Sequence, residues 1–226
     1  MNKLRIDFLS ALPDSFQSVL NTGILRIASE KELVEYHIHN LHYYSDNKFG
    51  HIDDTPYGGG SGMLIKCQPV FDCINELKNQ RKYDEIIYLT PEGKKFTQSD
   101  ANELSLNKSI ILLSGRYKGI DQRIRDELIT KEISVGDFVL SGGELASLII
   151  ADSVVRLIPG ALGDAESALT DSFMNGLLEP PQYTRPQNYN GFSVPEVLTS
   201  GNHKSIEEWQ EKQSLDKTKR LRPDLL

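Results

Sequence analysis

The sequence alternates apolar segments with helical patterns, and this alternation restricts the fold more than any other feature. Patterns typical of strands cover residues 4–9, 35–40, 85–90, 109–114 and 132–140. Helical patterns begin at about Asp14, a predicted N-cap, and cover 69–77, 120–128 and 145–157. The last follows Ser141 and Glu144, which have the S-x-x-E spacing of a capping box. Strands alternating with helices predict an α/β fold with a mostly parallel sheet.

The C-terminal part has a different pattern. Residues 160–170 are small, polar and without periodicity, and prolines become frequent after Asp171 while strand signals become few. We therefore expect a first domain over 1–160, a mobile linker over 161–170, and a small, mainly helical domain over 171–226.

Composition restricts the partners and the compartment. There are 32 acidic and 25 basic residues, and the net charge of −7 disfavours binding of nucleic acid by bulk charge, although a local basic patch is compatible with it. No apolar run reaches the ~18 residues of a membrane span, and no signal peptide precedes the first strand. Cys67 and Cys73 cannot make a four-ligand zinc site, and no metal ligands are predicted. We expect a cytoplasmic protein without a membrane segment.

Three predicted strands are followed by glycine-bearing turns, at residues 88–93, 113–119 and 134–143. Ligands of open α/β sheets bind beyond the carboxyl ends of the strands, and glycine lets a ligand approach the backbone. Two interpretations are equally compatible with these turns. They either form one nucleoside-shaped pocket together or are three ordinary strand-to-helix turns. A further glycine-rich loop, 58–62, lacks the G-x-x-x-x-G-K-[ST] spacing of a phosphate-binding loop, so a lid or a close backbone contact is the better interpretation.

Two charged residues are candidates for chemistry. Arg156 stands near the end of an otherwise apolar helix, where it fits either a satisfied C-terminal charge or an electrophile over a pocket. Asp171 follows the predicted linker, and by local sequence it fits the N-cap of a next helix.

The ordered motifs of the whole chain resemble the bacterial tRNA (guanine-N1)-methyltransferase family. The matching segments are R-I-D-F-L (5–9), D-D-T-P-Y-G-G-G-S-G-M (53–63), Y-L-T-P-E-G (88–93), L-L-S-G-R-Y-K-G-I-D-Q-R (112–123), 134–145, 171–173, Y-T-R-P (183–186), 194–203 and R-P-D-L-L (222–226). The resemblance implies transfer of a methyl group from S-adenosylmethionine to N1 of the guanosine at tRNA position 37, next to the anticodon.

The resemblance also implies a fold and an assembly. Members of this knotted (SPOUT) class have a trefoil knot in the C-terminal part of the first domain, which binds the cofactor, and a small second domain that binds tRNA. They form homodimers with composite active sites, in which the cofactor pocket comes from one subunit and the C-terminal domain from the other. The resemblance leaves open whether Mg²⁺ takes part.

Carried over by residue, the resemblance implies that Asp171 is the general base, that Arg156 stabilises guanine O6, and that Glu179 recognises guanine. The implied cofactor-binding residues are Tyr88, Leu89, Thr90, Pro91, Gly93, Gly115, Tyr117, Ser134, Val135, Gly136, Asp137, Phe138, Val139, Leu140, Gly142 and Gly143. Independently, a basic run near the C-terminus predicts phosphate contacts from Lys217, Lys219 and Arg220, and Arg185 extends this patch.

Two other functions fit the motifs: a knotted ribose 2′-O-methyltransferase and a non-catalytic RNA-binding module. The chain also departs from the family pattern in three places. Lys118 stands where relatives usually carry Glu, Ala146 replaces a frequent Pro, and residues 41–44 differ from the usual stretch. The role of Lys118 is therefore open.

Overall fold

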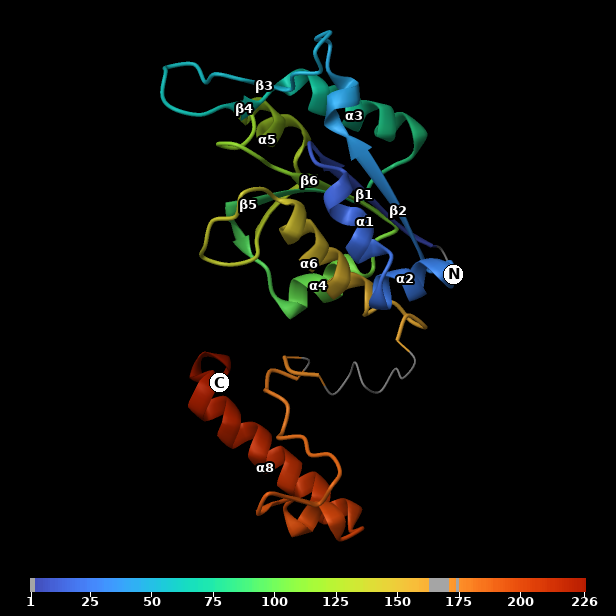
Figure 1. The fold of residues 1–226 in the computed structure, drawn as a ribbon, viewed down its shortest axis with the longest axis vertical. Helices are drawn as coiled ribbons and strands as arrows, with labels where there is room; N and C mark the ends of the chain where they lie inside the picture. The colour runs from blue at the N-terminus through green and yellow to red at the C-terminus, as the bar shows by residue number, and fades with distance from the viewer. Residues whose placement is uncertain (1–2, 163–170, 174) are drawn as a thin grey trace. The chain divides into compact units, whose positions relative to one another are not determined.

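The computed structural model describes residues 3–162, 171–173 and 175–226. The chain divides into two compact units, Met1–Gly163 and Asp164–Leu226. Most of the segment predicted as a mobile linker, 163–170, lies outside the described residues. The first unit has the predicted α/β fold (Figure 1).

A five-stranded sheet forms the centre of the first unit. Its order is β2-β1-β6-β5-β7, and every neighbouring pair is parallel. The strands are β1 (Leu4–Ser10), β2 (Val34–Asn40), β5 (Glu85–Lys95), β6 (Ser109–Ser114) and β7 (Lys131–Ser134). A short antiparallel pair, β3 (Asp53–Asp54) and β4 (Leu64–Ile65), lies outside this sheet. The predicted parallel sheet is confirmed.

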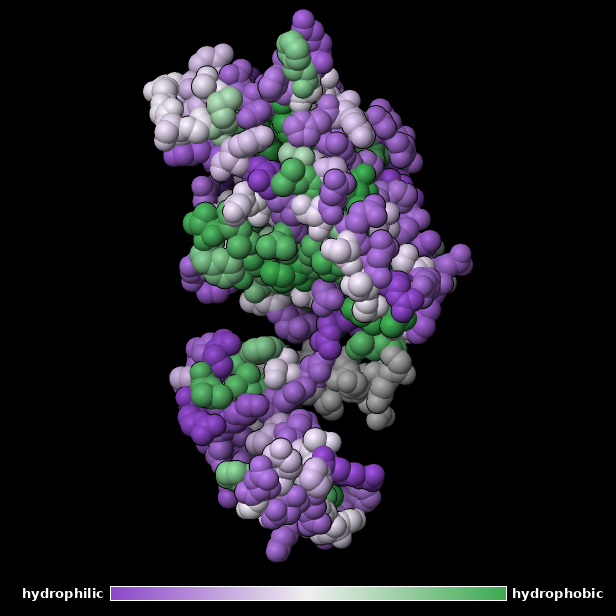
Figure 2. Space-filling view, viewed as in Figure 1, coloured by the Kyte–Doolittle hydropathy of each residue, from purple (hydrophilic) through white to green (hydrophobic). Residues whose placement is uncertain are grey.

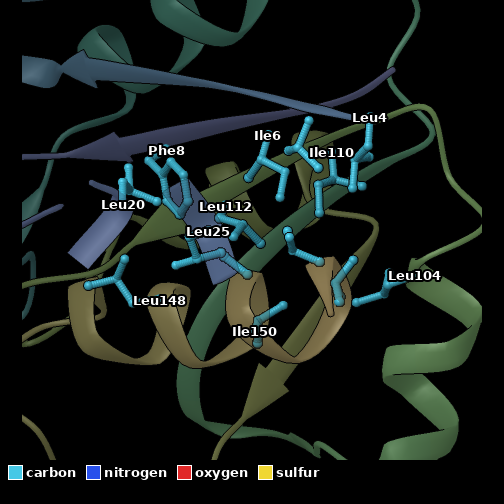
Figure 3. Close-up of a cluster of buried hydrophobic side chains, with 14 of the residues drawn as sticks. Leu4, Ile6, Phe8, Leu20, Leu25, Leu104, Ile110, Leu112, Leu148 and Ile150 are labelled. Carbon is cyan, nitrogen blue, oxygen red and sulfur yellow. The ribbon is translucent and has the colours of Figure 1, made fainter. Parts of the chain in front are cut away.

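Helices cover both faces of the sheet. One face carries α1 (Asp14–Leu20), α2 (Gly23–Glu30), α4 (Gln98–Leu104) and α6 (Glu144–Val155). The other carries α3 (Cys67–Gln80), α5 (Gln122–Leu128) and the 3₁₀ helix η1 (Leu41–Tyr44). On the first face, Ile6 and Phe8 of β1 pack with Leu148 and Ile150 of α6 (Figure 3). Burial on both faces explains why the strands read as nearly continuous apolar runs.

Several predicted boundaries are wrong. Strand β5 does not end at Pro91 but continues to Lys95, with a register shift between Leu89 and Lys94 that takes the proline out of the ladder. The strand predicted over 132–140 ends at Ser134, and the rest of that segment is a loop. Helix α1 has Pro13, not Asp14, at its N-cap position, without a side-chain cap.

A buried polar cluster lies on the α3 face of the sheet. The Asp7 carboxylate is fully buried, and it accepts hydrogen bonds from Arg5 Nε (2.7 Å) and the Tyr83 hydroxyl (2.8 Å), with His39 Nε2 at 2.7 Å. Burial alone would raise the pKa of Asp7, but the hydrogen bonds from His39, Arg5 and Tyr83 outweigh it and lower the pKa to about 2.

Replacing Asp7 by Asn is expected to lower the free energy of unfolding by about 3–5 kcal/mol at neutral pH, because it leaves Arg5 without its buried counter-ion. The folded-state pKa of Asp7 lies below the ordinary value of 3.8, so its ionisation stabilises the fold above about pH 4 and loses this effect as the pH falls towards 2. Urea unfolding between pH 7 and pH 3 measures both effects. The difference in free energy of unfolding between wild type and Asp7→Asn should become smaller at low pH, by roughly 2 kcal/mol once Asp7 is fully protonated. A difference that does not depend on pH would contradict this assignment.

Over residues 171–173 and 175–226, the second unit contains one long helix and several small elements. They are β8 (Asn188–Tyr189), β9 (Phe192–Ser193), η2 (Glu196–Thr199), α8 (His203–Leu221) and η3 (Pro223–Leu225). Asp171 does not cap a helix, because residues 171–173 form a bend and a turn. No helix within the described ranges is long and apolar enough to span a membrane.

Candidate active site

A cavity of about 320 Å³ opens beside the middle of β5 and at the carboxyl ends of β6 and β7. Its three walls are the segments 88–92, 115–120 and, without Asp137, 133–143, together with Arg125 and Ala146. The three glycine-bearing turns singled out in the sequence therefore meet around one pocket. The volume lies at the lower end of the range for small-molecule sites, roughly 300–1,000 Å³.

Glycines let the three walls approach one another. A Cβ on Gly143 would lie 2.8 Å from Ser114 Cα, and a Cβ on Gly115 would lie 2.8 Å from Tyr88 Cε2. Gly143 N donates a hydrogen bond to Gly115 O (2.8 Å), and Arg116 forms an antiparallel bridge with Gly142. Because backbone and ring atoms occupy the space of any side chain at Gly115 and Gly143, these two positions require glycine.

Fourteen of the predicted cofactor-binding residues line this cavity, namely Tyr88, Leu89, Thr90, Pro91, Gly115, Tyr117, Ser134, Val135, Gly136, Phe138, Val139, Leu140, Gly142 and Gly143. Two others do not. Gly93 packs against the backbone of Glu132 and Ile133 in β7, where a Cβ would lie 2.5 Å from Ile133 N. Asp137 is exposed and pairs with Lys95 (2.9 Å).

The wall formed by Tyr88 is supported by an arginine that the sequence analysis missed. The Arg125 guanidinium lies 5.7 Å from the centre of the Tyr88 ring. It also donates to Glu132 Oε1 (2.7 Å) and Glu92 Oε2 (2.7 Å). The hydrogen bonds to Glu132 fix the guanidinium, and burial raises the pKa of the Tyr88 hydroxyl. It lies on α5, two residues beyond the matching segment 112–123, and the residue types around it gave no signal of this role.

A buried carboxylate at the start of α6 holds the second and third walls together. Glu144 accepts a hydrogen bond from Ser10 Oγ (2.7 Å) and pairs with Arg116 (3.5 Å). The predicted capping box of Ser141 and Glu144 is therefore wrong: α6 begins after Gly143 without a side-chain cap. Glu144 instead connects the end of β1 to the pocket rim.

Lys118 lines the pocket at the point where the glycine-rich loop 58–62 meets it. A Cβ on Gly62 would lie 2.6 Å from Lys118 Cγ, and Lys118 N donates to Met63 O (3.0 Å). Ile65 N and Gly119 O are joined in the same way (3.0 Å). The chain directly after the loop is thus fixed to the second wall by backbone hydrogen bonds. Of the loop's glycines only Gly62 makes the expected close contact, because a Cβ on Gly58, Gly59 or Gly60 would meet no atom within 4 Å.

Arg156 is the C-cap of α6, at the opposite end of the helix from the pocket-lining Gly143. The 12 residues of α6 rise about 18 Å. Arg156 therefore stands well away from the pocket of its own chain, and it is absent from the pocket lining.

Exposed apolar side chains gather over α6 and the loop before it (Figure 2). Leu145 is 59% exposed and Ile149, one turn further along the same face, is 47% exposed. Phe138 and Val139 of the loop are exposed as well. A helix that is apolar on its outer face is typical of a subunit interface.

The second unit brings Asp171 and Glu179 into one corner at the C-terminal half of α8. Glu179 N donates to Ser172 Oγ (3.0 Å), the neighbour of Asp171. The Arg222 guanidinium lies 5.6 Å from the centre of the Phe173 ring, on the other side of Ser172. Contacts within this unit alone therefore join the segment of Asp171 to Glu179 and to the end of α8.

The basic residues of α8 differ in their environment. Lys219 and Arg220 are exposed, but Lys217 donates its ammonium hydrogen bond to Glu179 O (2.8 Å). A phosphate contact from Lys217 would compete with that bond. Arg185 is exposed on a separate segment of the same unit.

No metal site is visible in the part of the chain that the structure describes. Groups of three or more His, Cys, Asp or Glu side chains able to hold an ion do not occur among these residues.

Comparison with known proteins gives one consistent result. Residues 4–226 match the family tRNA (Guanine-1)-methyltransferase TrmD. A protein from Christiangramia forsetii is 54% identical over 223 residues, which is 99% of either chain, and one from Azobacteroides pseudotrichonymphae is 54% identical over 98% of this chain and 100% of the relative. A protein from Bacteroides fragilis is 52% identical over 99% of either chain. All three are named tRNA (guanine-N(1)-)-methyltransferase.

Proposed function

Because this chain belongs to the tRNA (guanine-1)-methyltransferase TrmD family, we propose a residue-level account of how it methylates N1 of guanine in tRNA. The chain is a methyltransferase, and its family implies S-adenosylmethionine as the methyl donor. The observation that carries the proposal is the pocket enclosed by three glycine-bearing turns. We take the target to be the guanosine at position 37, next to the anticodon, and the reaction to occur in the cytoplasm.

The residues that line the pocket support S-adenosylmethionine as its ligand. Gly115, Gly142 and Gly143 expose backbone to the cavity, while Leu89, Phe138 and other apolar side chains offer surface to an adenine ring. When bound, the cofactor supplies an activated methyl group on a sulfonium. The role of the protein here is to hold that methyl in line with N1 of guanine, which is a proximity effect.

The proton on guanine N1 must leave before or as the methyl arrives. We assign its removal to the Asp171 carboxylate, which would hold the proton, and the stabilisation of the negative charge that builds on O6 to the Arg156 guanidinium. Glu179, joined to the Asp171 segment through Ser172, is suited to hold the guanine donor edge. The guanine must be splayed out of its stack to enter such a site.

The active site is best completed by two chains. Arg156 stands at the far end of α6 from the pocket, about 18 Å along the helix, which exceeds the reach of one side chain. The exposed Leu145 and Ile149 lie on the outer face of α6, between these two positions. We therefore propose a homodimer packed through α6, in which each pocket receives Arg156 and Asp171 of the partner subunit.

We also propose that the first unit is knotted, as the family implies. The close approach of Gly143 to Ser114 and Gly115, and the bridge between Arg116 and Gly142, support this path for the chain. In the second unit we propose tRNA contacts from Arg185 and the exposed Lys219 and Arg220, with Lys217 positioning Glu179. The predicted domain bounds, 1–160 and 171–226, and a role for Mg²⁺ stay predictions.

The function is tested by radiolabelled methyl transfer from S-adenosylmethionine to bulk tRNA lacking the modification, followed by nuclease digestion and nucleoside analysis. We expect the label in 1-methylguanosine. Parallel samples with and without EDTA decide whether a divalent ion takes part in the transfer. Label in a 2′-O-methylated nucleoside would identify a ribose methyltransferase instead. Binding of tRNA without transfer would identify an RNA-binding module.

A further inference from the structure

The segment from η1 to the start of β3 exposes aromatic side chains that no part of the site described above uses. Tyr43 is 86% exposed and Phe49 is 72% exposed. Lys48 Nζ lies 4.8 Å from the centre of the Phe49 ring, and the His51 ring lies 6.1 Å from it, tilted by 59°. Tyr43, Lys48, Phe49 and His51 are called the aromatic loop below. Exposed rings that gather on one short segment, unlike single exposed side chains, are typical of a contact surface.

The aromatic loop is held in shape by its own hydrogen bonds. His42 Nδ1 lies 2.7 Å from Gly50 O, which joins η1 to the residue after Phe49. Phe49 N donates to Asn47 Oδ1 (2.7 Å), and Ser45 Oγ donates to His51 O (2.7 Å). These hydrogen bonds already order the loop that carries the rings. Binding of a ligand would therefore cost little further loss of conformational entropy in the loop.

The aromatic loop is also fixed to helix α3. Gln68 Nε2 donates to Tyr44 O (2.6 Å), and Asp46 N donates to Gln68 Oε1 (3.2 Å). Further along the chain, the loop that follows β3 is bonded to the pocket wall at Lys118. The aromatic loop and the rim of the pocket are thus parts of the same unit, connected through one continuous segment (Figure 1).

We propose that the aromatic loop is a stacking surface for unpaired bases of the tRNA substrate, on the loop that carries the target guanosine. This proposal rests on the proposed function. Base faces stack on aromatic rings irrespective of sequence, and a lysine beside the ring suits the neighbouring phosphate. The segment 41–52 holds one lysine and one aspartate, so its contribution to binding comes mainly from stacking and little from net charge. A partner held by apolar burial alone would not explain the cation placed over the ring.

The test compares tRNA affinity at several salt concentrations for wild type, Phe49→Ala, Phe49→Trp and a matched control. Leu106→Ala is that control, because Leu106 is an 83% exposed apolar residue outside the aromatic loop. We expect Phe49→Ala to weaken tRNA binding at least about fivefold, Phe49→Trp to retain it, and Leu106→Ala to leave it unchanged.

Salt dependence separates stacking from charge. Phe49→Ala should shift the plot of log affinity against log salt without changing its slope. Lys219→Ala with Arg220→Ala should flatten the slope by roughly 0.7–0.9 for each phosphate that is no longer neutralised. Steady-state kinetics should show the same loss of binding. Phe49→Ala should raise the KM for tRNA and leave kcat at saturating tRNA unchanged.

The readout is binding, so that this proposal and the proposed function fail separately. If wild type methylates guanine N1 and Phe49→Ala binds tRNA as wild type does, the stacking surface is wrong and the function stands. If Phe49→Ala lowers tRNA affinity in a protein that transfers no methyl group, the surface stands and the function is wrong. If Phe49→Ala changes the oligomeric state of the protein and leaves its tRNA affinity unchanged, the aromatic loop is a contact between protein chains. That result would overturn the proposal.

Discussion

Asp171→Asn is expected to lower kcat for methyl transfer to tRNA by at least about two orders of magnitude, because the amide cannot accept the proton from guanine N1. Arg156→Ala should lower kcat to a similar extent through loss of the charge opposite O6. The proposed mechanism assigns both residues to the guanine and neither to the cofactor, so calorimetry should give wild-type affinity for S-adenosylmethionine in both variants. Single-turnover rates near wild type in either variant would remove that residue from the mechanism.

Mixed dimers test whether these residues act on the partner's pocket. In a dimer of one Asp171→Asn subunit and one Gly115→Val subunit, a composite arrangement leaves one site with an intact pocket and an intact base. Co-expressed and randomly mixed subunits should then recover about a quarter of the wild-type rate, although each variant alone is inactive. If all catalytic groups belonged to one chain, every site would carry a defect and no activity would return.

Gly115→Val is expected to weaken binding of S-adenosylmethionine by at least about 100-fold, or about 2.7 kcal/mol. A Cβ at position 115 would lie 2.8 Å from Tyr88 Cε2 and 2.9 Å from the Tyr88 hydroxyl oxygen, so the ring that forms this pocket wall must shift. Overpacking of this kind also costs about 1–3 kcal/mol of stability. Calorimetry gives the affinity, and a thermal unfolding scan shows whether the fold is retained.

A graded series keeps the pocket assignment testable if the valine variant does not fold. Gly115→Ala adds only the Cβ, and it should weaken cofactor binding less than valine while the affinity for tRNA stays near wild type. Unchanged cofactor affinity in folded Gly115→Val protein would show that the ligand binds elsewhere.

Individual residues show how much of the site can be predicted from local sequence. The segments 88–93, 113–119 and 134–143 were recognisable because glycine and proline interrupt apolar runs, and most of their residues line the pocket. Gly93 and Asp137 belong to the same turns, but one packs against β7 and the other pairs with Lys95. Position along a turn does not determine on which side of the backbone a residue lies, because that depends on what the turn packs against.

The same distinction applies to the charged groups. The spacing of Ser141 and Glu144 satisfies a capping box, yet Glu144 binds Ser10 and Arg116, which are distant in sequence. Arg125 supports Tyr88 across two elements, and nothing in its local sequence indicates this. Hydrogen bonds to distant partners outcompete local ones here because burial of a carboxylate demands strong donors wherever they lie.

By itself, the sequence determined the alternation of strands and helices, the parallel sheet and the ordered motifs of the family, since periodicity and turn chemistry are encoded by neighbouring residues. Only the tertiary structure decided that the strand order is β2-β1-β6-β5-β7, that three segments close one cavity, and that Glu144 binds Ser10 and Arg116. These features depend on packing between segments far apart in the chain, and the free energy of such packing is a property of the whole core rather than of any local pattern.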